Sequence, residues 1–358
     1  MNGKPVSSAN IISDTLKIFN SMLEDIEHAT KYIYLETYKF ENGPIGVAFR
    51  DKLTTKAREG VKVKVLIDAW GSGVNESFFK KMIEFGGEVK FFKKLKLSIN
   101  SFRKNHERDH RKLLIIDNQI TYISSLNFTN YGIGWREISL RITGGITKAF
   151  KHIFLINYNL KNTYKFNKKR LTRIVKIGDY EIIRDVPSVL TQRLRKKILH
   201  LVNQAEKEII IETPYFLPTR AIRDALVKSA KERDVKIKVI MPLRSDVKSV
   251  NILKNYYLGR MYLAGIKILF YEPHNLHSKF IIVDNNFYVG TSNFDYRSFR
   301  YQFEIGLIGK DENILNQLKH HYVDTIADCI EFDYNKWKNR SRWQKIAEAL
   351  LIPLRHFL

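Results

Sequence analysis

Two short stretches of the sequence repeat one arrangement of chemically active side chains. "HRKLLIID" begins at His110 and "HSKFIIVD" begins at His277, and each places a Lys two positions after the His. Residues i and i+2 of a β-strand lie on the same face, so His110 would share a face with Lys112, and His277 with Lys279. Each pair would present an imidazole and an ammonium group to one substrate.

A further set of polar residues follows each stretch in the same order. The two sets are Ser125, Asn127 and Glu137 in the first half, and Thr291, Asn293 and Glu304 in the second. Hydroxyl and amide groups can donate hydrogen bonds to the oxygens of an anion, so Ser125 and Thr291 are expected to bind substrate. No rule of core packing requires the same five polar types twice, which favours a functional interpretation.

The Asp that ends each stretch has a different expected role. Asp117 precedes "NQ" and Asp284 precedes "NN", at points where a turn should follow the strand. Asp is a common turn residue because its side chain can bind nearby backbone groups. We therefore predict that Asp117 and Asp284 fix structure, and that they take no part in the chemistry.

Two sets of this kind can perform phosphodiester transfer. Lys and Asn side chains can hold the nonbridging oxygens of a phosphate and offset its developing charge. One imidazole can attack phosphorus, and the other can protonate the leaving alkoxide and then deprotonate an alcohol or water. A Glu on the far ring nitrogen would fix each tautomer. This chemistry requires no metal and no cofactor.

Zinc is the main alternative use for the two histidines. The chain has a single cysteine, Cys329, and no HExxH pattern, so neither common set of zinc ligands is present. His320 and His321 are adjacent in sequence and would point to different sides of a helix. The sequence therefore does not predict a metal site.

The repeat extends well beyond the two stretches. "YIYLETYKF" (residues 32–40) resembles "IIIETPYFL" (residues 209–217), and residues 51–68 resemble residues 224–241. Short β-rich runs alternate with helical patterns, which is typical of α/β proteins. Apolar residues from Ile12 to Ile26 predict a helix before the first of these strands. An offset of about 170 residues indicates a duplicated domain, because solenoid repeats are far shorter.

Three segments are predicted. Residues 1–170 form the half with the first motif, residues 171–335 form the half with the second, and residues 336–358 form a basic, amphipathic tail. In the tail, Trp343, Ile346 and Leu350 fall on one helical face. Such a helix could lie at a lipid interface, or it could pack on the protein's own core.

The charge of the chain points to a polyanionic partner. Lys and Arg number 61 against 37 Asp and Glu, a net charge of +24. The phosphates of a membrane surface or of a nucleic acid would attract such a protein. A mixed basic and apolar stretch at residues 90–104 is a candidate contact. Neither a signal peptide nor a run of about 20 apolar residues is evident.

The two stretches, read with "SSLN" and "GTSN" after them, resemble the His-x-Lys-x4-Asp signature of the phospholipase D superfamily. Within that superfamily the chain is most similar to bacterial cardiolipin synthases. The segments that carry this likeness include "EGVKVKVLIDAWGS", "ETPYFLP" and "GTSNFDYRSFRYQFE". The resemblance covers about residues 12–358.

The resemblance implies a fold and a reaction. The fold would be a duplicated α/β structure, with two α/β/α sandwich halves related by a pseudo-two-fold axis around one shared active site. A phosphatidyl group on His110, the expected nucleophile, would be transferred to a second phosphatidylglycerol, giving cardiolipin and glycerol. His277 would be the acid and base. The protein would act peripherally, on the cytoplasmic side of a bacterial membrane.

Other functions of the same superfamily stay open. A phospholipase D would release phosphatidic acid by using water, and a phosphodiesterase or nuclease would cleave nucleic acid. All of these reactions share the covalent intermediate, so the motifs do not separate them. The apolar stripe of the tail favours lipid, because a nucleic-acid site of the same charge requires no such stripe.

Overall fold

The computed structural model describes residues 5–93, 105–160 and 166–356. Most of the basic stretch at residues 90–104 therefore lies outside the described residues. The elements of the first half are β1 (Ser8–Asp14), α1 (Thr15–Glu27), β2 (Tyr32–Thr37), α2 (Pro44–Arg58), β3 (Lys62–Asp68), α3 (Lys80–Glu84), β4 (Glu88–Phe92), β5 (Arg108–Asp109), β6 (Leu113–Ile116), β7 (Ile120–Ser124), β8 (Arg136–Thr143) and α5 (Thr147–Tyr158).

The second half repeats this series. After a short α6 (Lys168–Leu171), its elements are β9 (Val175–Ile177), β10 (Tyr180–Asp185), α7 (Arg193–Gln204), β11 (Glu208–Glu212), α8 (Arg220–Glu232), β12 (Lys236–Pro242), α9 (Lys248–Leu253), α10 (Asn255–Tyr262), β13 (Lys267–Tyr271), β14 (Phe280–Val283), β15 (Asn286–Gly290), α11 (Tyr296–Tyr301), β16 (Gln302–Gly309), α12 (Glu312–Ala327) and β17 (Cys329–Glu331).

The two sheets have the same strand order. The first runs β1-β8-β7-β6-β2-β3-β4, and the second runs β10-β16-β15-β14-β11-β12-β13 with β9 and β17 added at its edges. In both, parallel strands adjoin an antiparallel set. This equivalence confirms the predicted duplication. The predicted boundary at residues 170 and 171 falls inside α6.

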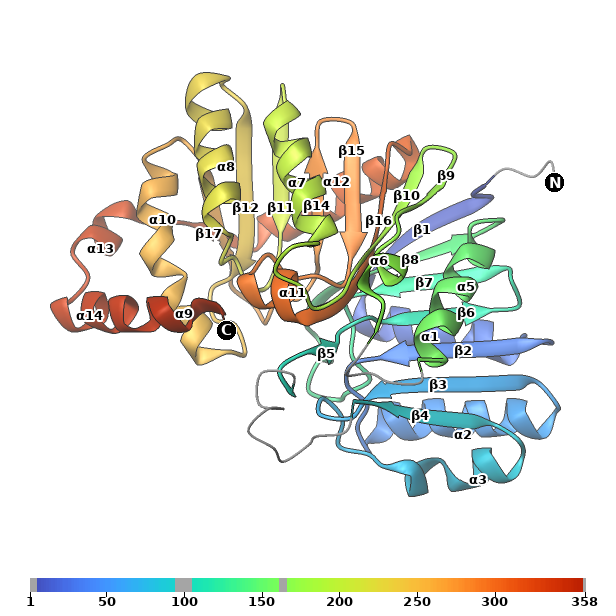
Figure 1. Cartoon of the computed structure of the whole chain (residues 1–358). Coiled ribbons are helices and arrows are strands. Elements are labelled where there is room, and N and C mark those ends of the chain that lie inside the picture. The colour runs from blue at the N-terminus through green and yellow to red at the C-terminus, as the bar shows by residue number, and fades with distance from the viewer. Residues whose placement is uncertain (1–4, 94–104, 161–165, 357–358) are drawn as a thin grey trace.

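The halves share one core. Figure 1 shows them side by side, with β5 between them. A single cluster of buried residues joins Leu140 of the first sheet and Phe154 of α5 to Phe303 of the second sheet and Leu318 of α12. Separate clusters fill the outer sides, beneath α1 and α2 in one half and beneath α7 and α8 in the other. Each sheet is thus covered on both faces, as the predicted sandwich requires.

The first helix is shorter than the apolar spacing predicted. Ile12 lies in β1, which pairs antiparallel with β8, and the helix begins at Thr15. The Asp14 side chain caps it by accepting a hydrogen bond of 2.8 Å from the Lys17 N–H. Pairing in the sheet thus outweighs the helical pattern at the start of this segment.

Asp117 and Asp284 hold the starts of the neighbouring strands. The Asp117 carboxylate accepts the backbone N–H groups of residues 30–32, at 2.6–2.8 Å. Asp284 accepts those of residues 206–208, at 2.9–3.0 Å. Burial opposes ionisation, but these donors outweigh it and keep the pKa of both carboxyls below the ordinary value. Each Asp thereby anchors the strand that lies beside its own motif.

The tail forms α13 (Tyr334–Lys338), α14 (Arg342–Leu351) and a final 3-10 turn (Ile352–His356). One side of the tail is docked on the protein. Glu348 is buried and pairs with Arg340 through two contacts of 2.8 Å. Leu351 and Ile352 pack against a small cluster that includes Val250 of α9.

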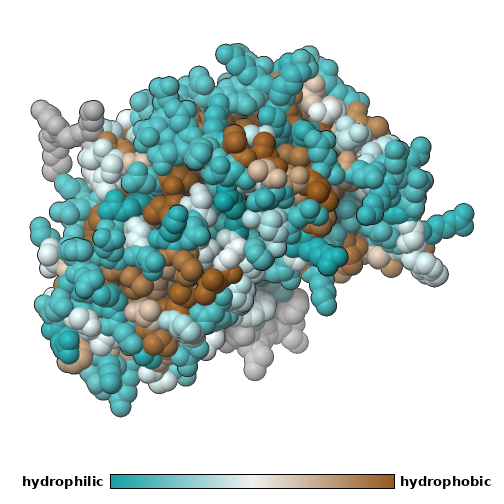
Figure 2. Space-filling view, turned by 180° about the vertical axis from the view of Figure 1, so that it is seen from behind, coloured by the Kyte–Doolittle hydropathy of each residue, from teal (hydrophilic) through white to brown (hydrophobic). Residues whose placement is uncertain are grey.

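The other side of the tail leaves apolar residues in solvent. The Trp343 side chain is 80% exposed and Leu350 is 70% exposed, and Ile346 and Leu354 are about half exposed. The helix is therefore docked and also carries an open apolar stripe, so each of the two predicted interpretations describes one of its sides. Elsewhere, the rear face of the molecule shows separate hydrophobic patches between hydrophilic side chains (Figure 2).

Candidate active site

Backbone pairing between the halves brings the two histidines together. β5 pairs with β16, and the His110 N–H donates to the carbonyl of Phe303 at 3.0 Å. The matching contact runs the other way, from the His277 N–H to the carbonyl of Arg136 at 2.8 Å. Phe303 and Arg136 immediately precede the two predicted glutamates. Each histidine is thus joined to the strand that carries the glutamate of the other half.

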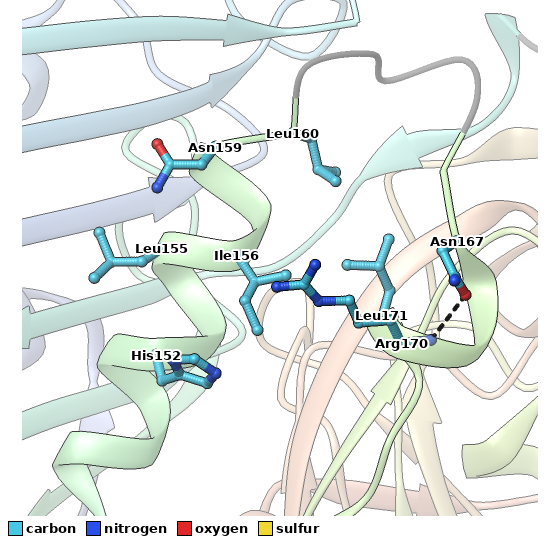
Figure 3. Close-up of a pocket in the computed structure, with 8 residues that line it drawn as sticks. All are labelled: His152, Leu155, Ile156, Asn159, Leu160, Asn167, Arg170 and Leu171. Carbon is cyan, nitrogen blue, oxygen red and sulfur yellow. Dashed lines mark hydrogen bonds between the residues drawn. The ribbon is translucent and has the colours of Figure 1, made fainter.

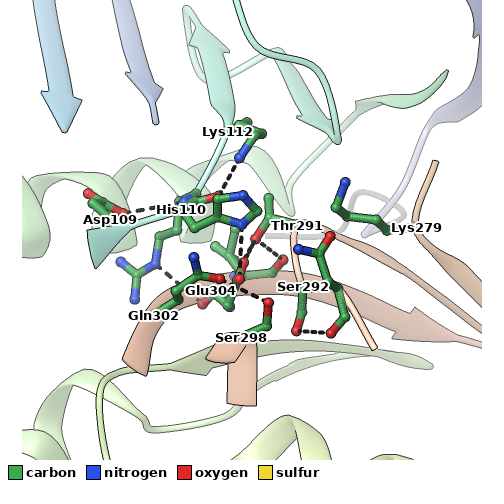
Figure 4. Close-up of polar contacts among 12 residues, drawn as sticks. Asp109, His110, Lys112, Lys279, Thr291, Ser292, Ser298, Gln302 and Glu304 are labelled. Carbon is green, nitrogen blue, oxygen red and sulfur yellow. Dashed lines mark hydrogen bonds and ion pairs between the residues drawn. The ribbon is translucent and has the colours of Figure 1, made fainter. Parts of the chain in front are cut away.

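The side chains follow the same crossed pattern. His110 Nδ1 lies 3.0 Å from Glu304 Oε1, and His277 Nδ1 lies 2.7 Å from Glu137 Oε1. All four side chains are buried. Because Nδ1 of each ring is engaged, Nε2 is the nitrogen left for chemistry. Figure 4 shows Glu304 below the His110 ring, with Lys112 on the ring's other side.

The two hydroxyls contact the glutamates, which differs from the substrate contact expected of them. Ser125 Oγ donates to Glu137, and Thr291 Oγ1 donates to Glu304. Each hydroxyl proton is therefore already engaged. Each glutamate joins a hydroxyl of its own half to an imidazole of the other half, which fixes the carboxylate in place.

The two lysines lie beside the histidines, where burial outweighs the carboxylates that favour their charged form. Lys112 Nζ donates to the carbonyl of His110 at 2.8 Å, and Lys279 Nζ donates to that of His277 at 2.7 Å. Burial lowers the pKa of Lys112 to about 7 and that of Lys279 to about 8. A bound anion would favour the charged form of both, so the two groups suit a phosphate.

The two asparagines complete the predicted set. Both line the cavity between the halves, and the Oδ1 atoms of Asn127 and Asn293 are buried with no hydrogen-bond partner in the described part of the chain. Buried polar atoms of a folded protein are nearly always paired. The two unpaired amide oxygens therefore indicate a site for a polar ligand that can donate a hydrogen bond.

The cavity itself has a volume of about 360 Å³ and is reached by both histidines. Its walls include several residues that sequence reasoning did not single out: Tyr38, Lys39, Trp70, Tyr131, Tyr215, Asp246, Asp295, Arg297 and Gln302. A signal for some of them was present, because Lys39 and Tyr215 each lie two positions after the repeated "ET", close to the ends of β2 and β11. Ligands of α/β sheets bind at such strand ends.

The two His–Glu pairs differ in charge. Burial raises the pKa of Glu304 to about 8, and burial together with the two lysines holds the pKa of His110 well below its ordinary value. Burial also acts on Glu137, but His277, Lys279 and Ser125 outweigh it and lower the pKa of this carboxyl. Burial and Lys279 lower the pKa of His277 as well, but Glu137 opposes them. The two pairs therefore differ mainly in their carboxyl groups, with Glu304 held towards its neutral form and Glu137 towards its ionised form.

The residue between His and Lys is Arg111 in the first motif and Ser278 in the second, and each contacts a different buried glutamate. Arg111 lies 3.9 Å from Glu36, whereas Ser278 donates to Glu212. Glu212 also contacts His321 Nε2 at 2.8 Å. His321 thus belongs to the support beneath the second motif, although its pair with His320 resembles a metal-binding sequence. Among the described residues, no group of three His, Cys, Asp or Glu is placed to hold a metal.

A second hollow of about 360 Å³ lies between α5 and α6 (Figure 3). Its lining combines leucine and isoleucine side chains with His152, Asn159, Asn167 and Arg170. None of the predicted catalytic residues lines it.

No described helix has the length and apolar character needed to cross a membrane.

The chain has extended similarity to cardiolipin synthases. Residues 22–154 and 198–325 match the family described as "Cardiolipin synthase, PLD-like domain". The major cardiolipin synthase of Bacillus subtilis is 30% identical over 369 residues, which cover 97% of this chain and 75% of that protein. A cardiolipin synthase of Staphylococcus aureus is 30% identical over 356 residues, covering 95% and 71%.

The fold is also known from a solved structure. The crystal structure of phosphatidylserine synthase from Haemophilus influenzae matches with a TM-score of 0.76 at 15% identity, over 99% of this chain and 97% of that one. The two matched family segments fall in the two halves that supply the crossed His–Glu pairs. These findings confirm the predicted resemblance: the chain belongs to the phospholipase D superfamily and, within it, to the cardiolipin synthase family.

Proposed function

We propose that the chain transfers a phosphatidyl group from one phosphatidylglycerol to another through a phosphohistidine, forming cardiolipin and releasing glycerol. The observation that carries the proposal is the pair of imidazoles, each held by a carboxylate of the other half, that open onto one cavity. A buried lysine lies beside each of these histidines. The family membership supports the phospholipid substrate.

In the first step, the Nε2 atom of His110 attacks phosphorus. A nucleophilic imidazole must be neutral, and the strongly lowered pKa of His110 meets this condition. The bond from phosphorus to the glycerol oxygen breaks, and His277 gives its proton to that oxygen. Ionised Glu137 favours the protonated form of His277 once the negative phosphate has entered the cavity.

In the second step, the roles of His277 reverse. His277 takes the proton from a hydroxyl of the incoming phosphatidylglycerol, whose oxygen attacks phosphorus as the bond to His110 breaks. Lys112 and Lys279 offset the charge on the nonbridging oxygens in both steps, and Asn127 and Asn293 hold these oxygens in place. Water entering instead of the alcohol would give phosphatidic acid.

The proposal places the protein on a lipid surface through its tail. Trp343, Ile346 and Leu350 form the exposed apolar stripe of α14, and Arg342 and Lys345 are exposed on the same short helix. Apolar and cationic side chains on one helix suit the interface of an anionic bilayer. The docked side of the tail packs in one cluster with Tyr215 and Val247, which also line the active-site cavity. A membrane bound at the stripe would therefore lie near the cavity.

The first prediction concerns the products. Purified protein incubated with phosphatidylglycerol vesicles should form cardiolipin and glycerol in equal amounts, as followed by lipid chromatography and a glycerol assay. Phosphatidic acid as the sole lipid product would show a hydrolase. Cleavage of single-stranded DNA without lipid turnover would overturn the lipid assignment.

The second prediction concerns the covalent intermediate. A phosphatidyl ester of p-nitrophenol has a leaving group that needs no proton, so His277→Ala should still react once and then stall with the phosphatidyl group on His110. Breakdown should slow by about 10²–10⁴-fold, because the base for the acceptor is missing. Peptide mass spectrometry would locate the group.

The matched variant is His110→Ala, which should give no burst of p-nitrophenol with the same ester. A burst from His110→Ala, with the modified peptide containing His277, would reverse the two assigned roles.

The third prediction concerns the tail. Replacing Trp343 and Leu350 together by Ser should weaken binding to phosphatidylglycerol vesicles by tenfold or more, roughly the effect of losing 1.4 kcal/mol of apolar burial. Turnover of a short-chain, soluble phosphatidylglycerol should stay unchanged. Val323→Ser on α12, where the side chain is 56% exposed, is the control. Vesicle sedimentation with equal binding of all three proteins would contradict this role.

A further inference from the structure

The walls of the active-site cavity carry different residues at equivalent positions of the repeat. Lys39 follows β2 where Tyr215 follows β11, and Tyr131 follows the first Asn where Arg297 follows the second. All four side chains line the cavity. The duplicated fold therefore holds a chemically asymmetric pocket, as a donor and an acceptor bound in one site would require.

Ring contacts place Tyr131 and Lys39 at the His277 end. The Tyr131 ring lies 5.2 Å from that of Trp135, which lies 5.5 Å from the His277 ring. Lys39 Nζ contacts the Tyr131 hydroxyl at 3.2 Å and lies 4.6 Å above its ring. Lys39 Nζ also lies 3.3 Å from Glu41 Oε1. These contacts fix an ammonium group beyond His277, on the wall of the cavity.

Asp246 belongs to the same end. The Tyr215 hydroxyl donates to its carboxylate at 2.7 Å, and Asn275 Nδ2 lies 3.4 Å from it. The negative charge of Asp246 also acts on His277 and Lys279, favouring their protonated forms. The side chain of Asp246 is exposed, so its carboxylate has room for further donors.

A carboxylate in this position is unexpected for phosphate binding alone. A buried lysine lies beside each of the two histidines that line the cavity, and Arg297 lines it as well, so an added negative charge weakens their attraction for a phosphate. A carboxylate is, however, the strongest acceptor available for a hydroxyl group. The carboxylate and the ammonium group at the His277 end therefore suit a ligand that carries both free hydroxyls and a separate phosphate.

We propose that Asp246, Tyr215 and Lys39 form the acceptor subsite, in which Asp246 and Tyr215 bind the glycerol hydroxyls of the acceptor and Lys39 binds its phosphate. This inference rests on the proposed function, in which His277 deprotonates the acceptor. The headgroup of phosphatidylglycerol has two hydroxyls, so one can react while the other is held by Asp246. A water molecule cannot contact Asp246 and Lys39 while it also presents a hydroxyl to His277, and the subsite thereby favours transfer over hydrolysis.

The test measures how the common intermediate divides between its two fates. With phosphatidylglycerol vesicles, the ratio of cardiolipin to phosphatidic acid should fall about tenfold in Asp246→Asn, because the variant loses a charged hydrogen bond to the acceptor. Lys39→Met should lower the same ratio. The ratio does not depend on total turnover, so loss of active protein would not change it.

Two further variants complete the design. Asp224→Asn, an exposed carboxylate on α8, should leave the ratio unchanged. Tyr215→Phe removes one hydroxyl of the subsite and should also lower the ratio. This variant tests the same subsite if Asp246→Asn does not fold. Cardiolipin formation by the unaltered chain, with the same ratio in the Asp246, Tyr215 and Lys39 variants, would overturn the subsite alone. An unaltered chain that makes no cardiolipin would overturn the proposed function as well.

Discussion

The active site depends on two hydrogen bonds that join the halves, one between His110 and Glu304 and one between His277 and Glu137. Each imidazole is oriented by a carboxylate of the other half, and each backbone N–H of these histidines donates to the residue before that carboxylate. Neither half can complete a site alone, because each would hold a histidine without its acid. The shared core around Phe303 holds the halves in the register that these contacts require.

The two His–Glu pairs of the duplicated sequence have different surroundings, which allows the two histidines to have different roles. Identical surroundings would give both imidazoles the same proton affinity, yet the proposed mechanism needs one that attacks as a neutral base and one that donates a proton. Burial raises the pKa of Glu304, while His277 and Lys279 hold Glu137 ionised. Differences around the repeat, rather than the repeat itself, separate the two roles. The same asymmetry continues outward to the cavity walls.

Much of the fold and of the site could be predicted from the sequence, because the duplication repeats the same strand patterns and the same polar residues. The strands, the order of the two halves, and the polar sets around His110 and His277 follow from periodicity and spacing alone. The crossed pairing was not readable, since Glu304 lies 194 residues from His110 and only the packing of the halves decides which glutamate meets which ring. Ser125 and Thr291 contact the glutamates of their own halves, and spacing along the chain does not distinguish such a contact from one with a substrate. The cavity walls come from loops such as that of Asp246, where no periodic pattern exists.

The most direct test of the crossed arrangement is a ¹⁵N NMR spectrum of the histidine rings in the Glu304→Gln and Glu137→Gln variants. Glu304→Gln should shift the ring resonances of His110 and leave those of His277 nearly in place, because only His110 loses its carboxylate. Glu137→Gln should do the reverse. Shifts of each histidine in response to the glutamate of its own half would contradict the account.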